Sequence, residues 1–226
     1  MAVESVGYQL DVNPTIIDHV ALYVSDPQRT AAALLARLPL RILEETDDFV
    51  LVGRSPELGK LTFFSASSPR EQGQLLRIGM AVPCAMASSS VDLGEELTVE
   101  LVPGPRDGEV TLDHVALRVP DPVSSARAWL ELGLEPMERV GTIERARIGD
   151  AFVELHPGAA APTRRPLLNH VGLLVESVDD AHASAVDAGL EVRRLVEAEN
   201  SRAIFLTGPD GVEVELVQHL PSFALV

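Results

Sequence analysis

The residues best suited to chemistry in this chain are histidines and glutamates that recur in similar segments. A histidine opens three of these segments: IDHVALYV at 17–24, LDHVALRV at 112–119 and NHVGLLV at 169–175. Glutamates occur in three others: LTVELV at 97–102, DAFVELHP at 150–157 and VEVELV at 212–217. Imidazole nitrogens and carboxylate oxygens are ligands for Zn, Ni, Co, Mn and Fe(II). The pattern therefore indicates metal chemistry, if the fold brings these side chains together.

The alternation within each segment is typical of a β-strand, in which successive side chains point to opposite faces. Around His114, the residues Val115, Leu117 and Val119 share one apolar face. The other face carries His114 followed by the small Ala116, which leaves room beside the imidazole. The pattern predicts that histidines and glutamates share the open face of a sheet whose other face is buried.

A fourth opening segment, LRIGMAV at 76–82, has Arg77 where the others have histidine. The four openings define four units, each with the predicted order β-α-β-β-β. Asp26-Pro27 and Asp121-Pro122 predict helix N-caps followed by a proline in the first turn. The second unit is shorter, and its stretch at 83–94 is expected to be a loop in place of the helix and the middle strands.

The spacing of the units indicates how they are organised. His19 and His114 are 95 residues apart, and Arg77 and His170 are 93 apart, which suggests that a pair of units was duplicated in tandem. The segment PGPRDGE at 103–109 is the expected linker between the pairs. The predicted domains are therefore an N-terminal barrel at 14–102 and a C-terminal barrel at 110–219.

The ordered set of DHVAL, NHVGLLV and GPDGVEVEL motifs resembles the vicinal oxygen chelate superfamily, also called the glyoxalase/bleomycin resistance/dioxygenase superfamily. This resemblance implies an α+β fold in which tandem βαβββ modules form two incomplete barrels, here with the second module truncated. It also implies one divalent metal ion, which would be Zn, Ni, Co, Mn or Fe. The implied metal ligands, all in the C-terminal barrel, are His114, Glu154, His170 and Glu215.

The N-terminal pair of units departs from the family pattern. It keeps His19 and Glu100, but Arg77 replaces one histidine, and KLTFF at 60–64 offers no carboxylate. Because arginine stays protonated and cannot bind a metal, this barrel is expected to be metal-free. An Arg77–Glu100 ion pair would fill the vacated site.

Three functions are compatible with the resemblance. The first is a lyase or isomerase similar to glyoxalase I or methylmalonyl-CoA epimerase, in which the metal binds two neighbouring substrate oxygens and stabilises an enediolate. Glu154 or Glu215 would then act as the catalytic base. Arg118, and His156 on the same face as Glu154, are the expected substrate-binding residues.

The second function is an extradiol-type Fe(II) ring-cleaving dioxygenase, with His114, His170 and Glu215 as a two-histidine, one-carboxylate triad. The sequence lacks the tyrosine that such enzymes carry shortly before the final glutamate, and a fourth ligand at Glu154 would occupy a position that oxygen chemistry needs. The third function is non-catalytic binding of a drug or other small molecule. The chain has only nine aromatic residues to line a groove for a flat ligand.

The composition limits the partners. The 226 residues include 18 Lys and Arg against 34 Asp and Glu, for a formal net charge of −16, which disfavours nucleic-acid binding. The sequence shows neither a signal peptide nor a membrane-spanning run, so a cytoplasmic protein with a small-molecule substrate is expected. A homodimer is compatible with this sequence, but the duplicated units make it unnecessary for building the site.

Overall fold

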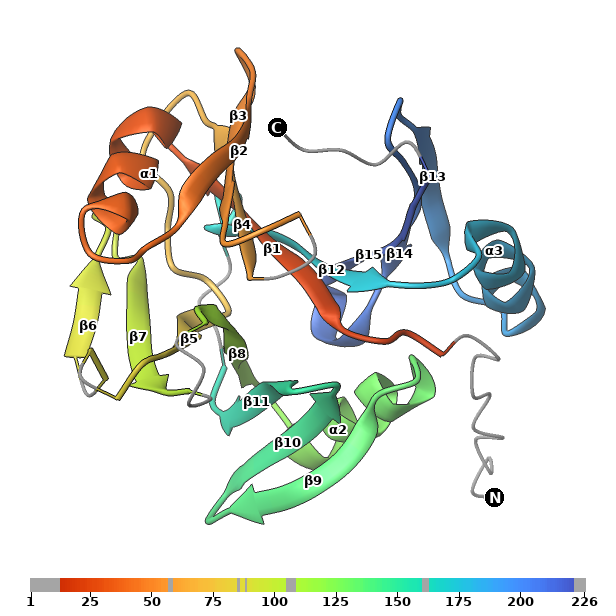
Figure 1. Ribbon diagram of the computed structural model, residues 1–226. Coiled ribbons are helices and arrows are strands. Elements are labelled where there is room, and N and C mark those ends of the chain that lie inside the picture. Colours follow the sequence, from red (N-terminus) through yellow and green to blue (C-terminus); the bar gives the residue numbers. More distant parts are fainter. Residues whose placement is uncertain are drawn as a thin grey trace.

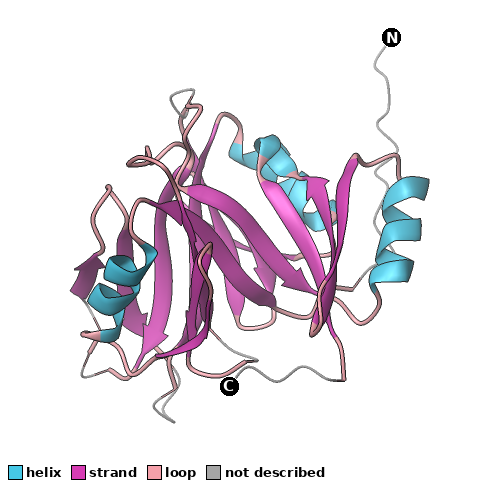
Figure 2. Ribbon diagram, turned by 90° about the horizontal axis from the view of Figure 1, so that it is seen from above, coloured by secondary structure: helices cyan, strands magenta, loops and turns pink. Residues whose placement is uncertain are grey.

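The computed structural model describes residues 13–56, 59–84, 86–87, 89–104, 109–159 and 163–221. The described residues form two mixed β-sheets with three α-helices on their outer sides (Figures 1 and 2). The helices are α1 (Pro27–Leu35), α2 (Pro122–Glu131) and α3 (Val178–Asp187), and a short 3-10 helix, η1 (Pro209–Gly211), precedes the last strand. No helix among the described residues is long and apolar enough to cross a membrane.

The first sheet has eight strands and joins the two ends of the chain. In spatial order they are β13 (Val192–Glu197), β14 (Ser201–Thr207), β15 (Glu213–His219), β12 (Leu168–Leu174), β1 (Ile17–Val24), β4 (Lys60–Ser65), β3 (Phe49–Gly53) and β2 (Arg41–Glu45). Figure 1 shows this sheet bending into a U, with β1 and β12 at its base. The sheet is curved but not closed into a barrel.

The second sheet has seven strands and comes from the middle of the chain. In spatial order they are β6 (Ser89–Asp92), β7 (Thr98–Pro103), β5 (Leu75–Val82), β8 (Thr111–Val119), β11 (Ala151–Pro157), β10 (Ile143–Ile148) and β9 (Glu135–Val140). It repeats the plan of the first sheet, since in each the two central strands are antiparallel and each has a parallel partner on its outer side.

Three of the four units have the predicted order β-α-β-β-β, and the α+β class is confirmed. The helix starts are also confirmed. Asp26 Oδ1 accepts a hydrogen bond from the Arg29 backbone N–H at 3.0 Å, and Asp121 Oδ1 accepts one from Val123 at 3.1 Å. The second unit lacks a helix as predicted, but the expected loop at 83–94 contains the strand β6.

The core lies along the apolar faces of the opening strands. Val20, Leu22 and Val24 on β1 are at most 1% exposed, and Val115, Leu117 and Val119 on β8 are equally buried. These residues belong to one hydrophobic cluster that runs through both sheets. The predicted division into an apolar face and a chemical face is therefore confirmed, and the histidine side of each strand is left for a site.

The prediction paired the first unit with the second, within 14–102, and the third unit with the fourth, within 110–219. The structure pairs the units differently. The first unit pairs with the fourth through β1 and β12, and the second pairs with the third through β5 and β8. The four opening strands carry nearly the same residues, so any two of them satisfy the same packing and hydrogen bonds. The sequence pattern consequently identified the strands but contained no information about which would become neighbours.

Candidate metal centre

The centre of the first sheet brings together three side chains from three neighbouring strands. In the antiparallel pair β1–β12, His170 lies opposite Ala21 and His19 lies opposite Gly172. In the parallel pair β12–β15, Gly172 lies beside Glu215. His19, His170 and Glu215 thus project from the concave face, and the small Ala21 and Gly172 leave space between them.

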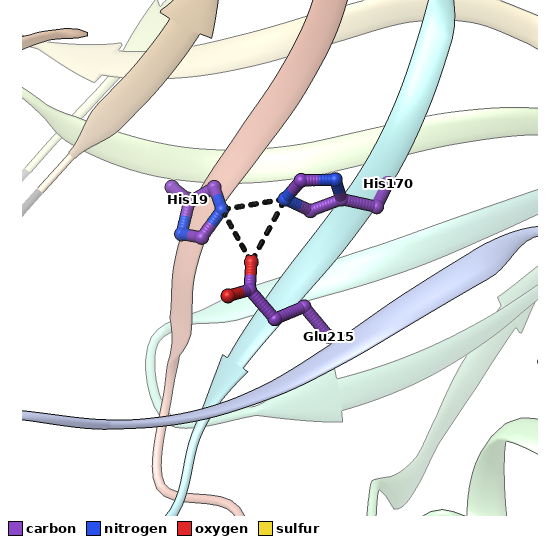
Figure 3. A group of neighbouring side chains, drawn as sticks. All are labelled: His19, His170 and Glu215. Atoms are coloured by element: carbon purple, nitrogen blue, oxygen red, sulfur yellow. Dashed lines mark hydrogen bonds and ion pairs between the residues drawn. The ribbon is translucent and has the colours of Figure 1, made fainter. Parts of the chain in front are cut away.

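The three side chains converge on one point (Figure 3). His19 Nε2 and His170 Nε2 are 2.9 Å apart, and Glu215 Oε2 lies 3.0 Å from the first and 2.8 Å from the second. A metal ion about 2.1 Å from each atom, with its ligands at right angles, would hold the three donors about 3.0 Å apart. The donor set and its spacing therefore fit a divalent metal ion, and these are the only three such residues that cluster within the described parts of the chain.

Each histidine is held by the residue that precedes it. His19 Nδ1 lies 2.8 Å from Asp18 Oδ2, and His170 Nδ1 lies 3.2 Å from Asn169 Oδ1. The Asp18 carboxylate can only accept, so the proton between it and His19 resides on Nδ1. Once Nε2 has lost its own proton, its lone pair is directed at the site, which is the arrangement that supports metal-binding histidines.

The surroundings of Glu215 keep its carboxyl group ionised, the form that binds a cation. Burial raises the pKa of Glu215, but the charge of His19 and the hydrogen bonds from both histidines outweigh it, so that this pKa falls to about 2. Burial lowers the pKa of His19, but the Glu215 carboxylate and the hydrogen bond to Asp18 outweigh it and raise this pKa to about 9. For His170, burial and the charge of His19 lower the pKa. Without metal, His19 thus holds the proton that a metal would displace.

The position that would supply a fourth ligand is occupied by Thr62. In the β1–β4 pair, Thr62 stands beside Ala21, just as Glu215 stands beside Gly172 in the β12–β15 pair. Thr62 is buried and belongs to the same cavity wall. Its hydroxyl is not one of the usual ligands of these metals. The candidate site therefore offers three protein ligands and would leave coordination positions open on a bound metal.

The predicted ligand set is divided between the two sheets. His170 and Glu215 lie in the first sheet, where His19 completes the triad, whereas His114 and Glu154 lie on β8 and β11 of the second sheet. Glu154 is therefore not positioned to act together with Glu215. The cause is the pairing of the units, because β8, which carries His114, pairs with β5 and not with β12.

In the second sheet an arginine stands where the first sheet has its site. Arg77 Nε lies 2.6 Å from Glu100 Oε2, so the predicted ion pair is confirmed, and Arg77 Nη2 also lies 2.8 Å from Glu154 Oε2. Arg145 holds the other oxygen of Glu154 at 2.6 Å. His114 Nε2 is 3.8 Å from Glu100 Oε2. The guanidinium groups supply the positive charge that this pair of carboxylates requires.

The two predicted substrate-binding residues also lie in the second sheet. Arg118 and His156 are opposite each other in the β8–β11 pair, and His156 Nε2 contacts Glu154 Oε2 at 3.2 Å. Neither belongs to the wall of the cavity that contains the triad. Their positions give no support to a substrate-binding role at the metal centre.

The triad lies in the wall of a cavity of about 440 Å³ on the concave side of the first sheet. Three phenylalanines, Phe49, Phe64 and Phe205, line it together with Leu51 and Val217. The ring centroids of Phe64 and Phe205 lie 6.3 and 5.1 Å from that of His170. Aromatic rings thus border the space beside the candidate metal position.

The cavity also contains charged residues to which sequence reasoning gave no role. Asp18 is 2% exposed and Lys60 is 3% exposed. Lys60 Nζ and His219 Nε2 both approach Asp18 Oδ1, at 2.8 and 3.0 Å. Lys60 is the only lysine in the chain, and it lies on the same strand face as Thr62 and Phe64. The sequence could have indicated a role for Lys60, because its strand position places it beside the histidine of the opening strand.

Comparison with known proteins places this geometry in context. Residues 111–216 match the model of the Glyoxalase/Bleomycin resistance protein/Dioxygenase superfamily. No curated protein matches the sequence. Among solved structures, a proposed dioxygenase from Bacillus subtilis is similar with a TM-score of 0.77 and 17% identity, covering 93% of this chain and 87% of that chain.

Glyoxalase I from Zea mays is similar with a TM-score of 0.70 and 17% identity, covering 90% of this chain and 92% of that chain. The cppA protein from Streptococcus pneumoniae has a TM-score of 0.61 and 14% identity, covering 92% of this chain and 100% of that chain. At these identities the likeness shows a shared fold. Together with the sequence match, it shows that residues 111–216 belong to the glyoxalase/bleomycin resistance protein/dioxygenase superfamily and that the chain as a whole has its fold.

Proposed function

We propose that this protein is a metal-dependent enzyme that binds a small aromatic substrate through two neighbouring oxygen atoms and cleaves its ring with dioxygen, as an extradiol-type dioxygenase. The observation that carries this proposal is the triad of His19, His170 and Glu215, with Thr62 in the fourth position. Two histidines and one carboxylate that leave positions open are typical of non-haem Fe(II) oxygenases.

One of the sequence arguments against a dioxygenase does not apply to this site. That argument assumed a fourth ligand at Glu154, which instead binds Arg77 and Arg145 in the other sheet. When bound, Fe(II) would supply positions at which the two substrate oxygens and dioxygen are held next to each other. All three ligands come from one chain, so the site needs no second copy.

The cavity supports an aromatic substrate. Phe49 and Phe64 border the cavity, and the Arg194 guanidinium lies 3.7 Å from the ring centroid of Phe205; contacts with such rings favour aromatic ligands beyond the area they bury. Asp18 and Asn169 fix the orientation of His19 and His170, so the donors stay directed at the same point.

A lyase or isomerase that stabilises an enediolate remains the second candidate, favoured by the similarity in fold to glyoxalase I from Zea mays over 90% of the chain. In that reaction a ligand carboxylate leaves the metal to act as base. Here the departure of Glu215 would leave only His19 and His170 on the metal. The geometry therefore supports this candidate less well than the dioxygenase.

The test begins with metal content and continues with reaction type. The protein is reconstituted anaerobically with Fe(II), and dioxygen uptake and the absorbance of ring-cleavage products are followed with a panel of catechols. We expect about one Fe(II) per chain and uptake that is abolished in His170→Ala but retained in His114→Ala, the matched variant in the other sheet.

Other outcomes separate the remaining functions. One metal equivalent without dioxygen uptake, together with solvent deuterium exchange into an α-hydroxycarbonyl compound, would support the lyase or isomerase instead. Absence of metal after incubation with Fe, Zn, Ni, Co and Mn ions would overturn both enzymes and leave a small-molecule binding protein.

A further inference from the structure

The cavity holds a buried ion pair directly behind one metal ligand. Lys60 Nζ lies 2.8 Å from Asp18 Oδ1, and the other oxygen of Asp18 lies 2.8 Å from His19 Nδ1. The β1–β4 register places Lys60 beside His19. Lys60, the only lysine in the chain, is 3% exposed. It is linked through Asp18 to His19, whose Nε2 is a donor atom of the candidate metal centre.

Orientation of His19 does not by itself require a lysine. A buried ammonium group costs free energy unless it is paired, and the pair with Asp18 compensates that cost without making the arrangement more stable than a neutral one. A neutral donor would satisfy Asp18 Oδ1 equally well. The charge of Lys60, rather than its hydrogen bond, is therefore the feature that calls for a role.

The role follows from the charges that surround the ligand atoms. A divalent ion contributes two positive charges, and the buried Glu215 and Asp18 contribute one negative charge each. Without a further charge the loaded pocket would be neutral. With Lys60 it carries one positive charge, which complements a ligand that carries one negative charge. Charges act strongly here because Asp18, Lys60 and Glu215 are buried.

The other ionisable groups of the cavity leave this balance unchanged. Arg194 is paired with Glu213 at 3.0 Å, and Glu44 and Glu199 are exposed at the rim, where solvent and salt screen them. His219 donates its Nε2–H to Asp18 Oδ1, since the two atoms lie 3.0 Å apart and a carboxylate can only accept.

We propose that Lys60 determines specificity by giving the metal-loaded pocket a single positive charge, so that it selects substrates that bind as singly charged anions. This inference rests on the proposed function and narrows its substrate class. The substrate is a flat molecule with two neighbouring oxygens, one of which has lost its proton. Catechols that bind with one hydroxyl ionised have this chemistry.

The test uses the Zn(II)-loaded full chain, in which no turnover occurs. The affinities for 4-nitrocatechol, an anionic bidentate probe, and for imidazole, a neutral metal ligand, are measured by absorbance and calorimetry. Lys60→Gln removes the charge but keeps a donor for Asp18, whereas Lys60→Arg keeps the charge. The double variant Asp18→Asn/Lys60→Gln removes both charges of the pair and restores the net positive charge.

We expect Lys60→Gln to weaken nitrocatechol binding at least tenfold and imidazole binding less than threefold, with metal content unchanged. Lys60→Arg and the double variant should both restore nitrocatechol binding to within about threefold of the wild type. The proposal is overturned if Lys60→Gln weakens both ligands equally, or if the double variant binds nitrocatechol as poorly as Lys60→Gln does.

Lysine labelling gives an independent readout. With ¹⁵N at Nζ, the single lysine gives one side-chain signal whose chemical shift reports whether Lys60 is charged in the loaded protein. A neutral Lys60 would also overturn the proposal. A wild-type protein that binds no metal would instead overturn the proposed function itself, so the two failures are distinguishable.

Discussion

At the scale of single residues, one exchange in an opening strand distinguishes the two sheets. The histidine at the opening of the second unit is replaced by Arg77, whose guanidinium contacts Glu100 at 2.6 Å and Glu154 at 2.8 Å. A fixed cation thus substitutes for a metal between two carboxylates. In the first sheet, His19 and His170 occupy both opening positions, and the carboxylate Glu215 remains available to an ion.

The variant Arg77→His should create a second metal site. It would place an imidazole beside Glu100, His114 and Glu154 and remove the cation that contacts both carboxylates, while Arg145 would still contact Glu154. We expect metal analysis to find about two equivalents of Zn(II) per chain, against about one for the wild type. Arg77→Met is the matched control, since it removes the cation without adding a ligand. One equivalent in Arg77→His would show that this explanation of the second sheet is wrong.

Metal affinity at the triad should depend on pH through His19. Its pKa is raised to about 9 in the metal-free protein, so below that pH a metal must displace a proton to bind Nε2. Glu215, with a pKa of about 2, is already ionised across this range. We expect the affinity to rise about tenfold per pH unit from pH 7 to 9 and to level off above that.

Competition titrations with a chromophoric chelator at several pH values measure this slope. Asp18→Asn is the control, because it removes a hydrogen bond and a charge that raise the pKa of His19. In that variant the affinity should level off at a lower pH. An affinity that does not change between pH 7 and 9 would contradict the assignment of the displaced proton to His19.

At the scale of strands, the sites depend on glycines that face histidines across the central pair. A Cβ added at Gly172 would lie 2.5 Å from His19 Cε1, and one at Gly79 would lie 2.2 Å from His114 Nδ1. Both distances are shorter than van der Waals contact, so a larger residue must displace the imidazole. β12 and β5 thus shape the space in which the histidine of the neighbouring strand lies.

Gly172→Ala should therefore impair metal binding through His19. We expect the Zn(II) affinity to fall at least tenfold, along with a loss of stability of about 1–3 kcal/mol from overpacking. Gly79→Ala is a matched variant in the other sheet, and it should lose comparable stability while binding metal normally. Thermal unfolding and metal titration of both proteins test this, and a normal affinity in Gly172→Ala would contradict the geometry.

The sequence was sufficient to predict the strands and their faces but not their partners. Alternation in DHVAL and NHVGLLV fixed which side chains are buried, and the Asp-Pro pairs fixed the helix starts, because these are local properties of the chain. Partner choice depends on contacts between residues about 150 positions apart, such as His19 and His170. The repeated strands make those contacts interchangeable, so the sequence predicted that His170 and Glu215 lie together but not that His19 would be the third member of the triad.

At the scale of the whole molecule, the candidate metal site joins strands from the first and the fourth unit. β1 belongs to the first unit, and β12 and β15 belong to the fourth, yet they lie side by side in the first sheet. Metal binding should therefore stabilise segments that are distant in sequence, while leaving the intervening second sheet little affected. A site built from adjacent units would instead link β8 and β11 to β12 and β15.

Amide hydrogen exchange with and without Zn(II) distinguishes these arrangements. A ligand that binds only the native state slows amide exchange in the parts of the structure that must open before the ligand can leave. At a ligand concentration 100 times the dissociation constant, the free energy of that opening rises by about 2.7 kcal/mol. We expect added protection in β1, β12 and β15 and little change in β8 and β11. His170→Ala should show no metal-dependent protection in any strand. Protection of β8 and β11 together with β12 and β15, with β1 unaffected, would favour pairing of adjacent units, because only that arrangement places His114 and Glu154 at the metal.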